Sequence, residues 1–90
     1  MQGYCELCGK WSYHLHRHHI FFGHKQRQIS ERYDATAMLC PLCHSTDRKQ
    51  GVHGNHWICL QLQEQMQRKL MAKHDWTTED FIRIFGKSYL

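Results

Sequence analysis

The sequence lacks several features that would place it in other protein classes. It has no apolar run near the ~20 residues needed to span a bilayer, no internal repeat and no linker rich in Pro, Gly or Ser. The polar start Met1–Cys5 is not typical of a signal peptide. Ninety residues suffice for one domain and leave no room for a second. We therefore expect a single domain over residues 1–90, located in the cytoplasm and without a membrane partner.

Acidic residues are fewer than basic ones. Eight Asp and Glu against twelve Lys and Arg give a formal net charge of +4, and nine histidines add charge when protonated. This balance suits a polyanionic partner such as DNA, although many small basic proteins bind nothing acidic. Charge alone therefore leaves the choice of partner open.

Two cysteine pairs share the same spacing. We expect them to supply the cross-link that so short a chain needs for a stable fold. A chain of this size buries only about 60% of its unfolded surface. In Cys5-x-x-Cys8 and Cys40-x-x-Cys43 the two-residue gap lets both thiolates turn toward one ion, and four thiolates complete the tetrahedral shell of a structural Zn²⁺. Two disulfides or four unrelated thiols are the alternative, which a cytosolic setting disfavours. Cys59 has no such partner and is expected to be a buried thiol.

Hydrophobic patterning predicts an α+β fold. Residues 13–22 and 35–39 are predicted to be strands, and residues 24–32 a loop or short helical turn. Pro41 suits the first turn of a helix, which would carry Cys43 and His44 and break near Gly51 and Gly54. Zinc knuckles, two short antiparallel strands and this helix would make up the region 5–55.

Two helices are predicted after residue 55. Asn55 is a plausible N-cap for a helix over residues 56–73. Its expected buried stripe recurs every four residues, at Ile58, Leu62, Met66 and Leu70. Thr77 and Asp80 resemble a capping box for a final helix that stops at Gly86. The residues of this helix expected to face inward are Phe81, Ile84 and Phe85.

Most of the nine histidines lie before the long helix, and the densest run is Leu15–Phe22. A neutral imidazole can bind a metal, and another with a near-neutral pKa can take a proton from water. Hydrolysis of a phosphodiester bond uses both functions. The histidines therefore favour a metal-dependent hydrolase.

Together these residues resemble a known family. The triplet His18-His19-Ile20, followed by the segment 38–44 (MLCPLCH), is similar to the HNH endonucleases, in the subgroup that carries a four-cysteine zinc. The segments 51–55 and 85–90 are similar to small phage and prophage HNH proteins. The resemblance implies a ββα-metal fold and an endonuclease that hydrolyses DNA with low sequence specificity, in phage or prophage DNA processing inside a bacterial cell.

The resemblance also implies a role for each histidine. His18 and His44 would coordinate a catalytic divalent metal, which could be Mg²⁺, Mn²⁺, Zn²⁺ or Ni²⁺, and His19 would be the general base. His53 is the candidate third ligand, but it lies more than one helical turn beyond His44, so a loop must bring it back.

Two features depart from this assignment. Adjacent side chains of a regular strand point to opposite faces, so His18 and His19 converge only if the strand bends. His16 and His18 would share a face and form the competing pair. The family's middle asparagine corresponds to Ala35 here. Asn55 could replace it, although helix capping is its expected role.

Basic side chains in the segment 24–32 are expected to contact DNA phosphates, with solvated charge as the alternative. The residues are His24, Lys25, Arg27 and Arg32. Two rival functions stay open: a non-catalytic zinc module that binds DNA or a phage protein, and a zinc hydrolase with another substrate. The combination of His18, His19 and His44 favours the nuclease, because a binding module needs no general base.

Overall fold

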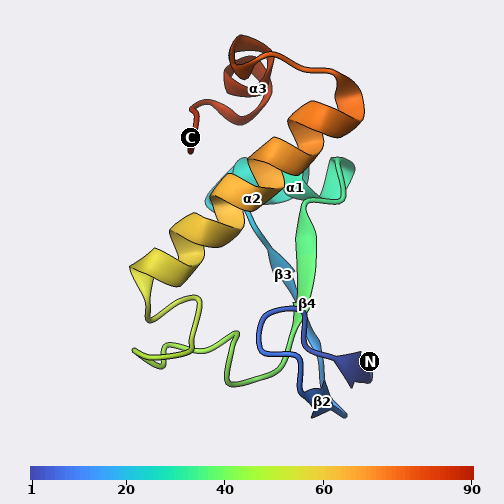
Figure 1. Ribbon diagram of the computed structural model, residues 1–90, viewed down its shortest axis with the longest axis vertical. Coiled ribbons are helices and arrows are strands. Elements are labelled where there is room, and N and C mark those ends of the chain that lie inside the picture. The colour runs from blue at the N-terminus through green and yellow to red at the C-terminus, as the bar shows by residue number, and fades with distance from the viewer. The chain divides into compact units, whose positions relative to one another are not determined.

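The computed structural model describes residues 1–90 and divides into two compact units (Figure 1). The knuckle unit combines Met1–His18 with Thr36–Cys59, and the helical unit combines His19–Ala35 with Leu60–Leu90. The predicted α+β class is confirmed, with two small sheets and three helices. The last boundary between the units falls at Cys59–Leu60, inside a helix. None of the helices is both long and apolar enough to cross a bilayer.

Two small sheets are built from short strands. β1 (Gly3–Tyr4) and β2 (Trp11–Ser12) pair antiparallel, with Tyr4 opposite Trp11. β3 (His16–His19) pairs with β4 (Thr36–Leu39), and the two run side by side in Figure 1. The strands predicted over residues 13–22 and 35–39 are thus present, the first of them shorter than expected.

The segment between the second cysteine pair and the long helix is a series of turns. The helix predicted from Pro41 is therefore wrong. The backbone N–H of Val52 returns to the carbonyl of Cys43 at 2.8 Å, which a continuous helix over these residues would not allow. Gly51 lies so close to the turn that a Cβ there would be 2.2 Å from the carbonyl oxygen of Ser45. The missing side chain of Gly51 is what lets the chain fold back on itself.

Helix α2 (His56–His74) begins where the sequence predicts. The Asn55 side-chain oxygen accepts hydrogen bonds from the N–H groups of Trp57 and Ile58, at 3.1 and 3.3 Å. Asn55 is therefore the N-cap, because it satisfies two of the donors that a helix start leaves unpaired.

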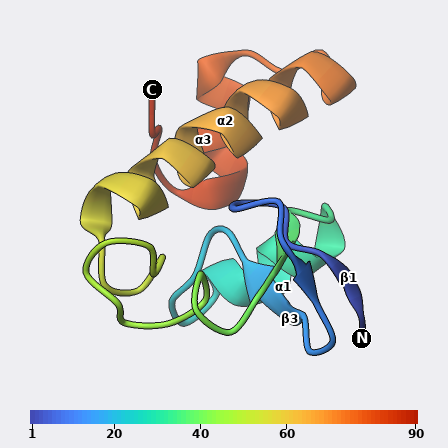
Figure 2. The ribbon, with the colours of Figure 1, turned by 60° about the horizontal axis from the view of Figure 1, so that its bottom comes forward.

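The helical unit contains α1 (Gln26–Arg32), the rest of α2 and α3 (Thr78–Phe85). Helix α1 occupies the segment for which a loop or short helical turn was predicted. The capping box of α3 is confirmed: the Thr77 hydroxyl accepts from Asp80 N–H, and the Asp80 carboxylate accepts from Thr77 N–H. Gly86 ends α3 with φ 94°. Helix α3 packs against α1, and in the view of Figure 2 it is partly covered by α2.

An aromatic core holds the helical unit together. Phe21, Phe81 and Phe85 are fully buried, and the Phe21 ring lies 4.7 Å from that of Phe85 and 5.5 Å from that of Phe81. Of the three inward positions predicted for α3, Ile84 is only partly buried. Ser30 bonds to both the N–H and the carbonyl of Phe21. These contacts place Phe21, which follows β3 in the chain, against α1 and α3.

The buried face of α2 differs from the predicted stripe. Met66 and Leu70 are buried, but Ile58 and Leu62 are partly exposed. Two glutamines are buried as well, at Gln63 and Gln67. The Gln67 amide donates to Ser88 Oγ at 3.0 Å and accepts from Tyr89 N–H at 2.6 Å, and Gln63 donates to the Ile20 carbonyl. A pattern of apolar residues at every fourth position could not predict the burial of these two glutamines, because their hydrogen-bond partners lie far away in the sequence.

Candidate metal sites

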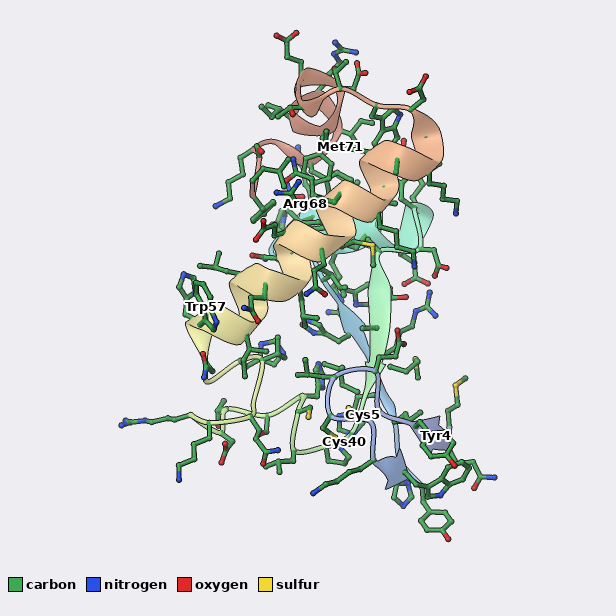
Figure 3. All side chains as sticks on the ribbon, in the orientation of Figure 1. Tyr4, Cys5, Cys40, Trp57, Arg68 and Met71 are labelled. Carbon is green, nitrogen blue, oxygen red and sulfur yellow. The ribbon has the colours of Figure 1, made fainter.

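The four paired cysteines meet in the knuckle unit. Their sulfur atoms all lie within 4.8 Å of one another, and no disulfide joins them. The first pair is held by a hairpin turn, in which Cys5 N–H donates to the Lys10 carbonyl and Gly9 N–H to the Cys5 carbonyl, both at 2.9 Å. The second pair follows β4 directly, and Figure 3 shows Cys5 and Cys40 close together.

The spacing of the sulfurs fits a tetrahedral ion. Cys8 Sγ and Cys40 Sγ are 3.9 Å apart. Ligands bound to zinc at about 2.3 Å in a tetrahedron are separated by about 3.8 Å. The predicted cluster of four cysteines is therefore present, and it could hold a structural metal such as zinc.

The acidity of the thiols also fits a cation. Burial alone raises the pKa of Cys5, but backbone N–H groups of the two knuckles lower it to about 6. Two of these donors, Leu7 N–H and Cys8 N–H, lie 3.4 and 3.5 Å from the sulfur. Burial raises the pKa of Cys43, and the neighbouring cysteines raise it further. Four adjacent thiolates repel one another, so a divalent cation is what would allow all four to ionise.

A second cluster in the same unit consists of histidines. Ring nitrogens of His18, His44 and His53 all lie within 4.8 Å of one another. The ring centroids form a nearly equilateral triangle, with sides of 5.2, 5.3 and 5.0 Å. His18 comes from β3, His44 follows Cys43, and His53 is returned by the turn in which its N–H donates to the Ser45 carbonyl at 3.1 Å. The chain reversal that was needed to bring His53 back to His44 is thus present.

The exposure of the three histidines is graded. His18 is only 3% exposed, His44 is half-buried and His53 is exposed. Three imidazoles could hold a divalent ion from one side and leave its other side open to water or a ligand, as catalytic metal sites do. Burial lowers the pKa of His44, and the neighbouring His53 and His16 lower it further. A lowered pKa favours the neutral imidazole that binds a metal.

His16 belongs to the surroundings of this histidine cluster. Its Nδ1 lies 3.0 Å from the Nδ1 of His44, and the two ring centroids are 5.1 Å apart. His16 and His18 therefore approach the same histidine from positions two apart on β3, as the alternation of a strand predicts.

His19 lies in the helical unit, where its side chain bonds to an acidic residue. His19 Nε2 is 2.7 Å from a carboxylate oxygen of Glu31 on α1. Since a carboxylate can only accept, Nε2 carries the proton and Nδ1 is the nitrogen left to accept one. Sequence reasoning missed Glu31. The one signal was its position as the first acidic residue after Glu6 in a basic segment.

Two of the predicted DNA contacts lie beside His19. Arg27 and Arg32 line a cavity of about 500 Å³, together with Gln28, Glu31 and His19. The other two predicted contacts are not among the lining residues, and both are exposed. These are His24 and Lys25.

The structure also shows the roles of Ala35, at the position of the family's asparagine, and of Asn55, its possible replacement. Ala35, which stands where the resembling family has asparagine, is completely buried. Its N–H donates to the Ser30 carbonyl at 2.7 Å, and its carbonyl accepts from Ile20 N–H at 3.0 Å. Asn55 caps α2. Both residues therefore have structural roles.

Comparisons with known proteins give no match. No family matches the sequence, and neither the curated proteins nor the solved structures include a significant relative. Function is therefore inferred from the chemistry of the residues themselves.

Proposed function

We propose that this protein is a metal-dependent endonuclease of the HNH type that hydrolyses DNA phosphodiester bonds with low sequence specificity, in phage or prophage DNA processing. The observation that carries the proposal is the cluster of His18, His44 and His53, whose ring nitrogens come within 4.8 Å of one another. A protein that bound metal only to stabilise its fold would need the four cysteines and none of these histidines.

The three histidines would hold the catalytic ion. An all-nitrogen set favours Zn²⁺, Ni²⁺ or Mn²⁺ over Mg²⁺, which prefers oxygen ligands. When bound, such an ion supplies positive charge to the phosphate and the leaving oxygen. Burial, together with the neighbouring His53 and His16, lowers the pKa of the half-buried His44 and so favours its neutral form. The exposed edge at His53 leaves room for a phosphate to approach.

His19 would act as the general base, with Glu31 as a positioning residue. The 2.7 Å hydrogen bond to the Glu31 carboxylate holds the imidazole in one tautomer and leaves Nδ1 to take a proton from water. The same carboxylate stabilises the imidazolium that forms. Arg27 and Arg32, which line the cavity beside His19, would contact DNA phosphates.

The test is a cleavage assay with controlled metal content. Protein with its structural zinc intact and no other ion is incubated with supercoiled plasmid and a panel of divalent ions. We expect nicking with at least one ion. His19→Ala should keep metal and DNA affinity and lose about 10²- to 10⁴-fold in rate, the scale of general-base catalysis. His44→Ala should lose the ion instead, and higher metal concentration should partly restore its rate.

A non-catalytic zinc module that binds DNA or a protein is the second candidate. The buried Ala35 and the capping role of Asn55 favour it, because neither asparagine position can assist the metal. This candidate predicts DNA or protein binding without nicking under any ion. That outcome, or a His19→Ala variant that cleaves at the wild-type rate, overturns the nuclease assignment.

A further inference from the structure

Three aromatic side chains form an exposed strip on the β1–β2 hairpin of the knuckle unit. Tyr4, Trp11 and Tyr13 are 68%, 47% and 70% exposed. Trp11 lies between the other two, with ring centroids 5.0 Å from Tyr4 and 6.2 Å from Tyr13. Figure 3 shows Tyr4 projecting outward from the hairpin. We call these three residues the aromatic strip.

Hairpin stability explains only part of this arrangement. Tyr4 and Trp11 are direct cross-strand partners, and such an aromatic pair stabilises a short hairpin. Tyr13 follows the end of β2 and pairs with nothing across the sheet, yet its ring joins the strip. Both contacts are edge-to-face, with interplanar angles of 81° and 83°. Each such contact covers one face of one ring, so these two contacts leave the other ring faces of the strip unused.

The strip lies on a hairpin whose turn is closed by backbone hydrogen bonds. The turn between its two strands is closed by the hydrogen bond from Cys5 N–H to the Lys10 carbonyl, and it carries the first cysteine pair of the metal cluster. A ligand that binds these rings would therefore find them ordered in advance, which reduces the entropy lost on binding.

The chain segment that carries the strip is mainly basic. No acidic residue occurs between Glu6 and Glu31, and the part of this stretch in the knuckle unit contains Lys10 and Arg17. The carboxylate of Glu6 itself accepts a hydrogen bond from Met38 N–H at 2.6 Å. An exposed aromatic surface with basic residues nearby in the chain, and with the one carboxylate of its hairpin engaged by a backbone N–H, suits a polyanion that also presents flat rings.

We propose that the aromatic strip binds unpaired nucleobases by stacking, while Lys10 and Arg17 contact the phosphates of the same single strand. Proteins that bind single strands combine these two features, because every base has a stackable face and every linkage a charge. Bases in a duplex are already stacked on one another and cannot occupy the rings. The inference rests on the proposed function for its class of substrate, and adds to it a preference for single-stranded or frayed nucleic acid.

The experiment measures binding rather than cleavage. Fluorescence anisotropy is recorded for the zinc-loaded full chain, without other divalent ions, on a labelled oligothymidine and on a duplex of equal length. Trp11→Ala should weaken single-strand binding roughly 5- to 100-fold, the scale of one lost stacking contact, and leave duplex binding nearly unchanged. Trp57→Ala is the matched control, because Trp57 is 66% exposed on α2 outside the strip. It should bind both probes like the wild type.

A second variant covers the case in which Trp11→Ala does not fold. Tyr13→Ala removes a ring that lies outside both strands, so the hairpin pairing is retained, and single-strand affinity should still fall several-fold. Zinc content and circular dichroism verify the fold of each variant. Equal losses on single strand and duplex, or unchanged single-strand binding by folded variants, overturn the inference. So does a chain that binds neither probe, or one in which sedimentation shows the strip covered by a second copy, with dimerisation abolished by Trp11→Ala.

The two proposals fail separately. A chain that nicks plasmid but shows no strand preference loses only the aromatic strip as a binding site. A chain that binds single strands through Trp11 but cleaves nothing under any ion loses only the nuclease assignment.

Discussion

The two units of this protein hold together by different means. In the knuckle unit the buried apolar side chains include no aromatic ring, and among them are Ala37, Leu39 and Val52. The four cysteine sulfurs of this unit cluster together. In the helical unit Phe21 packs against Phe81 and Phe85, and no cluster of metal ligands is present. The comparison teaches that one short chain can combine a unit whose four cysteines could bind a structural metal with a unit whose interior is filled by aromatic rings.

The largest effect is expected from breaking the knuckle unit. Cys43→Ser removes a buried sulfur from the cluster and should abolish tight zinc binding, which contributes about 10–16 kcal/mol in small zinc-dependent folds. Elemental analysis and chemical denaturation measure zinc content and the free energy of unfolding.

Cys59→Ser is the matched control for this prediction. Cys59 is a buried thiol of the same unit but lies outside the cluster, so its variant should retain zinc. A Cys43→Ser variant that keeps both its zinc and its stability would contradict the assigned dependence on metal.

A change of intermediate size should break the helical unit alone. Phe85→Ala leaves a cavity among the rings of Phe21 and Phe81, and such truncations cost about 3–5 kcal/mol. Urea denaturation measures the loss, and zinc content should stay at the wild-type level. Ile82→Ala on the same helix is the control, because Ile82 is 39% exposed and should cost much less. Loss of zinc by Phe85→Ala would show that the two units are not independent.

A smaller effect is expected at the hydrogen bond between His19 and Glu31. Glu31→Gln keeps the shape but removes the charge that orients and stabilises the imidazole. Loss of an orienting partner of this kind costs about 10- to 100-fold in activity, so plasmid nicking should slow by that factor. Zinc content and the free energy of unfolding should not change. A Glu31→Gln variant with wild-type nicking would remove Glu31 from the proposed machinery.

The smallest effect concerns the cap of α3 in acid. The hydrogen bond from Thr77 N–H, with further help from the Thr77 side chain and Arg83, lowers the pKa of the Asp80 carboxyl below its usual 3.8. Because the folded pKa is the lower one, the cap contributes fully above the unfolded value and is lost as pH falls through the folded value. Protection of the α3 amides against hydrogen exchange, corrected for the intrinsic rate at each pH, should therefore decrease below about pH 4. Asp80→Asn should remove this pH dependence while the knuckle unit is unaffected.

Sequence by itself determined the features that depend on nearby residues. The matched spacing of the cysteines predicts their cluster, because each knuckle is a local turn that directs two sulfurs to one point. Asn55 and the Thr77–Asp80 pair predict the starts of two helices, since a cap bonds only to the next two or three N–H groups.

Tertiary structure alone decided the features that depend on chain reversal. His53 joins His18 and His44 because the turn at Gly51 folds the chain back, where sequence reasoning had placed a helix. Gln67 is buried because the C-terminal tail supplies its partners. Glu31 meets His19 because α1 folds back on the segment 19–21 of the same unit. Neither residue type nor periodicity specifies such partners, which become neighbours only when distant segments pack.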